Sequence, residues 1–268
     1  MKIKLRIKQH NSYIFILLTL LIALGCNSEK KMKEKAIRKN NTLTKTEKKE
    51  GWILLFDGET FNGWRGLGLE KVPEGQWVIE NESIKKIPRS EGPKQTDGQP
   101  ILGGDLITIE TFENFELIWE WKLNKNGNSG IKYNVSEELS TSLPPVNAAL
   151  GWEYQMIDDM DIQDSPNKTS GALYDMIAPK NTVLKPIGEF NSSRIIVNGN
   201  HCEHWLNGKK VLEYEMGSAH FNSLFKQSKY KDIPDFVNKK NGHIVLQDHA
   251  EASWFRNIKI RRLDTGNN

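Results

Sequence analysis

Two short stretches of this sequence bring acid, base and amide side chains close together. In Glu153-Tyr154-Gln155-Met156-Ile157-Asp158, a carboxylate and an amide lie two positions apart. Because side chains alternate between the faces of a strand, Glu153 and Gln155 would share one face and Asp158 would lie on the other. Such a pair can hold neighbouring sugar hydroxyls or share a metal ion, or it can be part of an ordinary strand surface.

The second stretch is Gln247-Asp248-His249, which follows the apolar run that ends at Leu246. A histidine at a strand end can act as an acid or a base near neutral pH. His204 is also a candidate, although its pattern is more typical of a packed strand residue. In Asn128-Ser129-Gly130, the glycine would let a ligand approach the strand closely.

Standard catalytic motifs are absent from the sequence. It contains no G-x-S-x-G, no phosphate-binding G-x-x-x-x-G-K, no H-E-x-x-H and no C-x-x-C. Cys202 is one of only two cysteines, and a single cysteine in a strand is expected to pack as a small hydrophobic residue. An ordinary glycosidase would need two carboxylates about 5–10 Å apart across a cleft, and no recognisable pair is present.

Alternating apolar residues predict the strands that would position these groups. Phe115–Leu123 alternates over nine residues, with its aromatic and leucine side chains on one face. The other predicted strands are Ile53–Phe56, Trp77–Glu80, Ile101–Ile109, Ile131–Val135, Glu153–Ile157, Arg194–Val197, Cys202–Leu206, Lys210–Tyr214, His243–Gln247 and Trp254–Arg262.

The connections between these runs favour an all-β fold. Asn198-Gly199 and Asn207-Gly208 are typical of tight hairpin turns, so the strands around them should form a three-stranded meander. Only Ser218–Lys229 has helical spacing. Long loops are expected at Arg89–Gln99 and Glu137–Leu150. Many short strands without an internal repeat predict a β-sandwich or jelly roll.

Composition divides the 268 residues into a basic head and a larger body. Residues 1–50 carry 13 basic and 4 acidic residues, a net charge of +9. The remaining 24 basic and 30 acidic residues leave residues 51–268 at −6, and all 8 tryptophans lie there. A mildly acidic, aromatic-rich body argues against a nucleic-acid-binding protein.

The head has the pattern of a bacterial lipoprotein signal. A Lys- and Arg-rich start precedes the apolar run Tyr13–Leu24, which is shorter than the ~20 residues of a membrane span. It ends in Ala23-Leu24-Gly25-Cys26. We therefore expect a signal peptide at 1–25, lipidation of Cys26, a Lys-rich flexible tether at 26–50 and a folded domain at 51–264. The expected location is the cell envelope, at the periplasmic or outer-membrane side; an uncleaved N-terminal anchor is the alternative.

An ordered set of motifs resembles the 3-keto-disaccharide hydrolase family over residues 51–263. They are Leu55-Phe56-Asp57-Gly58, Gly63-Trp64, Gly103-Gly104-Asp105-Leu106-Ile107-Thr108, Phe115-Glu116-Leu117, Asn128-Ser129-Gly130-Ile131-Lys132-Tyr133, Glu153-Tyr154-Gln155-Met156-Ile157-Asp158, Leu173-Tyr174-Asp175, Glu203-His204-Trp205-Leu206-Asn207-Gly208, Leu246-Gln247-Asp248-His249 and Phe255-Arg256-Asn257-Ile258. The resemblance implies a concanavalin A-like lectin/glucanase jelly roll. It also implies cleavage of glycosides oxidised to a ketone at C3, by 1,2-elimination, by hydration of the resulting keto-glucal, or by both, with net hydrolysis.

The resemblance implies roles for particular residues. Glu153, His249 and Asp158 are the catalytic candidates, and Glu153, Gln155 and His249 are candidate ligands of a divalent metal ion. No organic cofactor is expected. The candidates for substrate contact are Asn128, Tyr133, Gln155, Lys185 and Gln247. Arg256 is expected to be structural.

One departure from the family pattern leaves a second function open. Relatives often carry His-Pro shortly after the Glu-Tyr-Gln strand, where this chain has Ser165-Pro166. The alternative to an enzyme is a non-catalytic carbohydrate-binding lipoprotein on the same fold. The expected partners are an oxidised glycoside or another carbohydrate, and a membrane through the N-terminal lipid.

Overall fold

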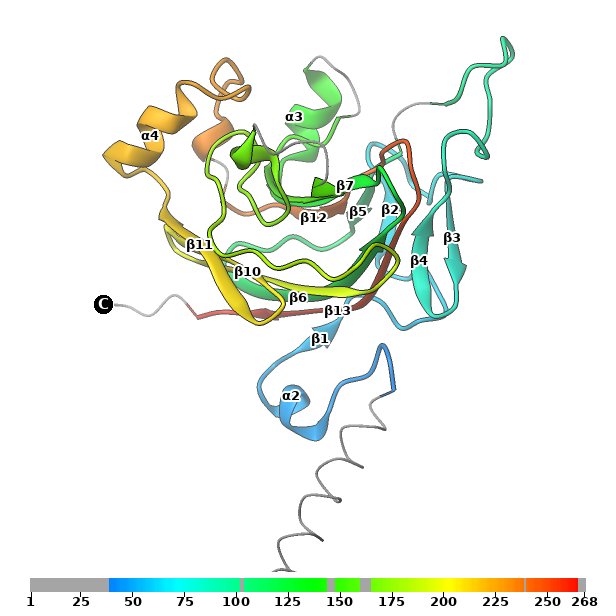
Figure 1. Cartoon of the computed structure of the whole chain (residues 1–268), viewed down its shortest axis with the longest axis horizontal. Coiled ribbons are helices and arrows are strands. Elements are labelled where there is room, and N and C mark those ends of the chain that lie inside the picture. The colour runs from blue at the N-terminus through cyan, green and yellow to red at the C-terminus, as the bar shows by residue number, and fades with distance from the viewer. Residues whose placement is uncertain (1–38, 102–103, 144–147, 160–164, 239, 265–268) are drawn as a thin grey trace, which may run out of the picture. The chain divides into compact units, whose positions relative to one another are not determined.

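The computed structural model describes residues 39–264, apart from 102–103, 144–147, 160–164 and 239. In this part of the chain, two antiparallel sheets pack face to face (Figure 1). The larger, sheet A, is hydrogen-bonded in the order β11 (Lys209–Glu215), β10 (His201–Leu206), β9 (Asn191–Asn198), β6 (Phe115–Leu123), β13 (Ser253–Arg262), β4 (Ser83–Lys86) and β3 (Trp77–Glu80), and β1 (Ile53–Leu54) pairs with β13.

Sheet B is the smaller layer and positions the candidate site. Its five strands are β2 (Trp64–Gly66), β5 (Leu106–Thr108), β12 (His243–Leu246), β7 (Asn128–Val135) and β8 (Trp152–Ile157), in that order. The strand pattern of the sequence correctly predicts an all-β sandwich, and the β9–β10–β11 meander is confirmed.

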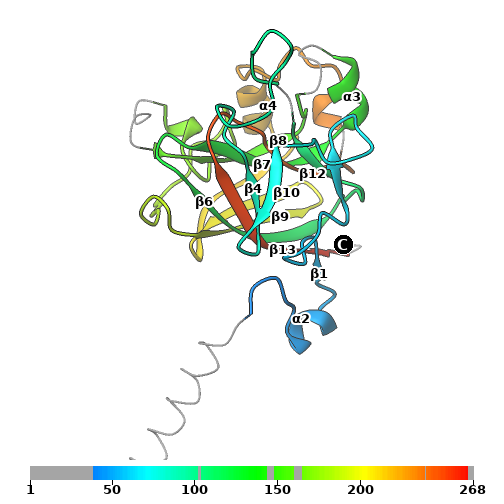
Figure 2. The same cartoon turned by 90° about the vertical axis from the view of Figure 1, so that its right-hand side faces the viewer.

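Five short helical segments complete the described chain. They are α2 (Lys45–Lys49), α3 (Glu137–Ser142), α4 (Ala219–Phe225) and the 3₁₀ turns η2 (Pro166–Lys168) and η3 (Phe236–Asn238). Both views place α3 and α4 on the side of sheet B that faces away from sheet A, and α2 beyond sheet A (Figures 1 and 2). Within the described residues, no helix combines the length and apolar character needed to cross a bilayer.

The core lies between the two sheets and explains the alternation along β6. The odd-numbered residues of β6 are buried, whereas Glu120 and Lys122 lie on the outer face of sheet A. Trp119 meets Tyr154 of β8 edge-on at a ring separation of 4.9 Å. Tyr154 therefore faces the core, and the odd-numbered residues of β8 face away from sheet A.

The ordered domain begins before the expected boundary at Gly51. Asn41 and Asn257 exchange hydrogen bonds, each backbone N–H donating to the other's side-chain Oδ1 at 2.6 and 2.7 Å. A capping box joins Thr44 and Glu47 at the start of α2, and Glu47 forms an ion pair with Lys259 of β13. Residues 40–50, which were expected to belong to a flexible tether, are therefore part of the folded domain. The signal peptide and Cys26 lie outside the described residues.

Five further elements differ from the pattern in the sequence. The short strands β2 and β4 were not predicted, and α3 begins the loop expected at Glu137–Leu150. The strand expected at Ile101–Ile109 is confined to Leu106–Thr108 in the described residues. The helix expected at Ser218–Lys229 is present but shorter, with Ser218 as its N-cap.

Candidate active site

Polar side chains form a row across the outer face of sheet B. In the strand register, Gly130 is opposite Gln155 and Lys132 is opposite Glu153, while the Gln247 backbone N–H donates to Gly130 O at 3.0 Å. Residues opposite each other in an antiparallel pair project to the same face. Glu153 and Gln155 are nevertheless only 2% and 1% exposed. The side of the sheet that is usually solvated is here polar and enclosed.

Three oxygen atoms of this row have no hydrogen-bond partner among the described residues. They are Glu153 Oε2, Gln155 Oε1 and Gln247 Oε1, and each is shielded from solvent. A buried acceptor without a donor costs about 1–3 kcal/mol. Such a cost in three neighbouring side chains is typical of a functional site rather than of a structural network.

Gly130 keeps the middle of the row open. A Cβ added at this position would lie 3.1 Å from both Cγ and Oε1 of Glu153, which is tighter than an ordinary contact. The position therefore favours glycine because a neighbouring group approaches the strand closely. The group that approaches Gly130 in this structure is the Glu153 side chain, and the close approach of a ligand expected from the Asn128-Ser129-Gly130 motif stays a prediction.

A chain of amide hydrogen bonds links this row to His249. Gln155 Nε2 donates to Asn128 Oδ1 at 3.1 Å, and Asn128 Nδ2 lies 3.3 Å from His249 Nε2. Because an amide nitrogen only donates, Nε2 is the acceptor and the neutral ring carries its proton on Nδ1. Burial lowers the pKa of His249, and Arg89 lowers it further, against the opposing effect of Asp248 and Glu153.

Asp248 fixes the segment that carries Gln247 and His249. Its carboxylate is buried and pairs with Lys86 at 3.0 Å and with Arg89 at 3.2 Å. Its backbone N–H donates to Asp105 Oδ1 at 2.7 Å. Such a network favours one arrangement, because separating the partners would leave a buried charge without its counter-charge.

The structure thus brings together five residues that the sequence pointed to. We call Asn128, Glu153, Gln155, Gln247 and His249 the sheet B cluster.

Lys229 approaches this cluster and was missed in the sequence. Its Nζ lies 3.8 Å from Glu153 Oε2 and 4.0 Å from the centre of the Tyr174 ring. The lysine lies about 75 residues from Glu153 in a segment rich in lysine, so no local pattern distinguishes it. Only the packing of the segment after α4 brings it to β8.

Tyr133 is not a substrate contact. It is fully buried between the sheets, and its hydroxyl bonds to His204 Nε2 at 2.9 Å and to the Tyr214 hydroxyl at 2.5 Å. The same network accounts for His204, which is a packed core residue. Cys202 is also buried, and burial raises the pKa of its thiol to about 12, so it is not a ready nucleophile.

Three other candidates lie away from the cluster. Asp158 directly follows β8 and accepts the Asn126 N–H at 2.9 Å, which fixes the turn between β6 and β7. Lys185 is on an exposed loop, and its Nζ donates to Phe190 O at 2.5 Å. Arg256 pairs with Glu120 at 2.8 Å and is structural, as expected. Ser165, which the resemblance matched to a histidine of relatives, immediately precedes η2.

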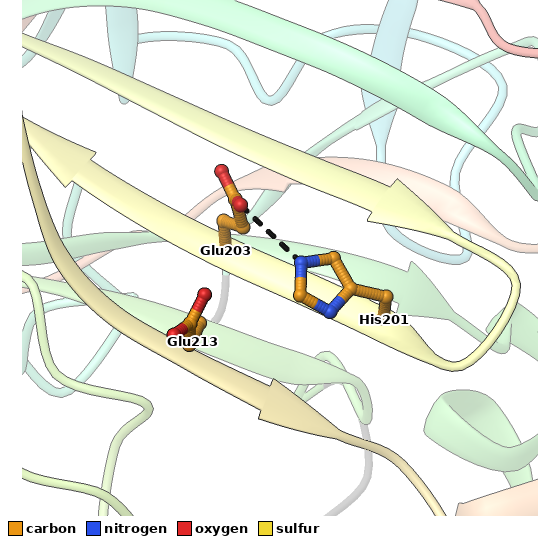
Figure 3. Close-up of side chains that lie close together, drawn as sticks. All are labelled: His201, Glu203 and Glu213. Atoms are coloured by element: carbon orange, nitrogen blue, oxygen red, sulfur yellow. Dashed lines mark hydrogen bonds and ion pairs between the residues drawn. The ribbon is translucent and has the colours of Figure 1, made fainter.

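A second group of His and Glu side chains lies on sheet A. Ligand atoms of His201, Glu203 and Glu213 fall within 4.8 Å of one another, and Figure 3 shows them on β10 and β11. Lys210 Nζ already pairs with Glu203 at 3.2 Å and with Glu213. Because a lysine supplies the positive charge there, this surface group is an ion-pair network rather than the candidate site.

A surface hollow of about 780 Å³ lies at the other edge of sheet B. Arg65, Leu69 and Glu137 are among its lining residues, none of which belongs to the sheet B cluster. Arg65 and Glu137 are already joined by two hydrogen bonds, of 2.5 and 2.6 Å. Burial and unpartnered polar atoms therefore locate the candidate site better than open volume does.

Comparisons with known proteins agree with this fold. A crystal structure of a protein described as a glycosyl hydrolase from Parabacteroides distasonis superposes with a TM-score of 0.72 and 31% identity, covering 84% of this chain and 100% of that chain. A second protein so described from the same organism gives 0.57 and 24% identity, over 79% of this chain and 99% of that one.

Sequence comparisons are more specific. A 3-keto-disaccharide hydrolase of Bacteroides thetaiotaomicron is 38% identical over 236 residues, covering 80% of this chain and 79% of the relative. Residues 51–261 match the family model of the 3-keto-alpha-glucoside-1,2-lyase-like domain. The chain therefore belongs to the family of 3-keto-alpha-glucoside-1,2-lyase-like domains.

Proposed function

We propose that this protein cleaves glycosides whose sugar carries a ketone at C3, by elimination across C1–C2 followed by addition of water. The supporting observation is the sheet B cluster, in a chain of this family: the buried Glu153 carboxylate has an oxygen that accepts no hydrogen bond, and on the same face Gln155 and Asn128 form a hydrogen-bonded chain to the His249 imidazole. The relative that is named a 3-keto-disaccharide hydrolase supports the substrate class.

The chemistry follows from the acidity of the carbon next to the ketone. Glu153 is the proposed base, which removes the C2 proton, and the electron pair is delocalised onto the ketone oxygen. The C1–O bond then breaks, and the carboxylic acid form of Glu153 returns the proton to the departing oxygen. Elimination by this route requires neither an oxocarbenium-like transition state nor a second carboxylate.

His249 has a separate role in the proposed hydration. Asn128 orients the imidazole in this structure, and a water molecule that takes the place of Asn128 at Nε2 can give its proton to the neutral ring as the water adds to the double bond. Gln155 holds Asn128 in turn. Gln155 and Gln247 also present amide oxygens that can accept hydrogen bonds from sugar hydroxyls.

A divalent metal ion is part of the proposal. Glu153, Gln155 and His249 would hold it, and Gln247 offers a further oxygen. Oxygens of Glu153, Gln155 and Gln247 that are buried and accept no hydrogen bond, together with the His249 imidazole, form a donor set that suits such an ion. The bound ion would polarise the ketone as a Lewis acid. Calorimetric titration with Mn²⁺, Zn²⁺ and Ca²⁺ should detect binding that Gln155→Leu weakens at least tenfold.

The test of the function is turnover of 3-keto-glucosides by the full chain, with added divalent ions and with a chelator. Glu153→Gln should lower kcat by about 10²–10⁴, as expected for loss of a general base. The matched control Glu189→Gln, at an exposed position, should leave kcat unchanged. Absence of turnover of every keto-glucoside, together with binding of unoxidised glycans, would instead identify a carbohydrate-binding protein.

We also propose that the protein is anchored to the cell envelope through a lipid on Cys26. The apolar run and the Ala23-Leu24-Gly25-Cys26 motif support this. The described chain begins at sheet A, where Asn41 bonds to β13 and Glu47 pairs with Lys259. The sheet B cluster is on the outer face of the other sheet. The beginning of the described domain and the sheet B cluster therefore lie on different sheets of the sandwich.

A further inference from the structure

The position of Lys229 is fixed by aromatic packing. Trp152 at the start of β8 packs edge-on against Phe236 at 4.7 Å, and Phe236 stacks on Tyr230 at 4.5 Å. Tyr230 directly follows the lysine, so this cluster ties the segment after α4 to β8. The Lys229 backbone N–H donates to Asp175 Oδ2 at 2.8 Å, which fixes the chain at the lysine itself.

The side chain of Lys229 bridges the cluster and the solvent. Its ammonium lies 3.8 Å from Glu153 Oε2 and 4.0 Å from the centre of the Tyr174 ring, while 47% of the side chain is exposed. Lys132, which is opposite Glu153 in the strand register, instead donates to Ala149 O at 3.1 Å and lies 3.8 Å from Asp105. Lys229 is therefore placed to face both Glu153 and an incoming sugar.

We propose that Lys229 is a catalytic residue of this site, whose ammonium donates a hydrogen bond to the C3 oxygen as negative charge develops there. This inference rests on the proposed function. The reaction needs a hydrogen-bond donor beside the base. The proton leaves from C2, whereas the negative charge accumulates on the oxygen of the neighbouring carbon. A base and a cation 3.8 Å apart can contact adjacent atoms of one sugar ring.

The electron movements balance without an additional reactant. When Glu153 takes the C2 proton, the C–H electron pair forms the C2–C3 double bond, and the ketone π pair moves to the C3 oxygen. That pair then restores the ketone, the C2–C3 pair forms the C1–C2 double bond, and the C1–O bond breaks. The leaving oxygen receives its proton from Glu153. Lys229 keeps its own protons throughout and stabilises only the intermediate oxyanion.

The experiment compares Lys229→Met with Lys226→Met in the full chain, using a 3-keto-glucoside. Lys226 is exposed at the C-cap of α4 and touches no member of the sheet B cluster in the described contacts. Loss of one oxyanion donor should lower kcat by about 10²–10³. Exchange of the C2 hydrogen with D₂O should slow by a similar factor, and Lys226→Met should change neither rate. Added methylammonium should restore part of the activity of Lys229→Met. A purely structural role of Lys229 would not produce this recovery.

The outcomes separate this inference from the proposed function. A folded Lys229→Met variant whose kcat stays within threefold of the unmodified chain would overturn the role of the lysine and leave the function standing. Absence of turnover by the unmodified chain would overturn both. If Lys229→Met melts at a lower temperature than the unmodified chain, Lys229→Gln replaces it in the comparison. The glutamine keeps a polar contact to Glu153 but carries no charge. Activity of that variant within threefold would equally overturn the role.

Discussion

Gly130 shows how a missing side chain contributes to the candidate site. A Cβ there would be 3.1 Å from the Glu153 side chain, so Gly130→Ala should displace the carboxylate by a few tenths of an ångström. We expect kcat on a 3-keto-glucoside to fall at least tenfold, because small misplacements of reacting groups are costly. The free energy of unfolding should fall by only about 1–3 kcal/mol, as for a modest overpacking.

Gly92→Ala is the matched control for this substitution. A Cβ at Gly92 would meet its neighbours at 3.5 Å or more, which is ordinary contact. Kinetics and chemical denaturation should therefore match those of the unmodified chain. Unchanged kcat in Gly130→Ala would contradict the inference that the glycine makes room for Glu153.

At the residue scale, strand alternation found most of the candidate site but not all of it. Glu153 and Gln155 were identified as a pair because they lie two positions apart, and the structure places them on one face. The same rule applied to β7 would have assigned Tyr133 to the face opposite Gly130, which is the core. Lys229 could not be found in this way, because its position depends on packing between distant segments.

At the element scale, a partly buried ion pair between Glu47 and Lys259 helps to hold α2 on sheet A. Burial raises the pKa of Glu47, but hydrogen bonds from Lys259 and Thr44 outweigh this effect and lower it to about 2. Glu47→Gln should therefore reduce the free energy of unfolding at pH 7 by about 1–3 kcal/mol, the range for a hydrogen bond to a charged group. Urea denaturation of both proteins gives this difference.

The pH dependence of that difference has a definite sign. A carboxyl whose pKa is lowered by folding stabilises the protein above its unfolded pKa, near 4.5, and loses this contribution as pH falls towards about 2. The difference in the free energy of unfolding between Glu47→Gln and the unmodified chain should therefore decrease as the pH falls from about 4.5 to about 2. The exposed control Glu74→Gln should show no gap at any pH. A gap that is constant from pH 7 to pH 3 would rule out the charge as its cause.

Long, regularly alternating strands were predictable from the sequence, and short or charged elements were not. The bounds of β6 follow from nine alternating residues, whereas β2 and β4 have only three and four. The composition of residues 40–50 is that of a flexible tether. Their order comes from Asn257 and Lys259, more than 200 positions away, which no local pattern contains.

At the scale of the whole molecule, the described chain begins beside sheet A, whereas the candidate site lies on sheet B. If Cys26 carries the lipid, Cys26→Ser should move the protein from the membrane fraction to the soluble fraction of the producing cells, and should abolish labelling by a fatty-acid analogue. Turnover of keto-glucosides should be unchanged, because the sheet B cluster does not involve the head. Labelled, membrane-bound Cys26→Ser protein would disprove attachment at this cysteine.

The origin of the hydrogen at C2 of the product tests the central claim most directly. Elimination followed by hydration in D₂O places one deuterium at C2 of the released 3-keto-sugar, whereas direct hydrolysis retains the original hydrogen. Mass spectrometry of the product at early times, corrected for exchange without protein, distinguishes these results. We predict one deuterium per product with the unmodified chain and loss of turnover with Glu153→Gln. Rapid cleavage with no deuterium at C2 would contradict the proposed elimination.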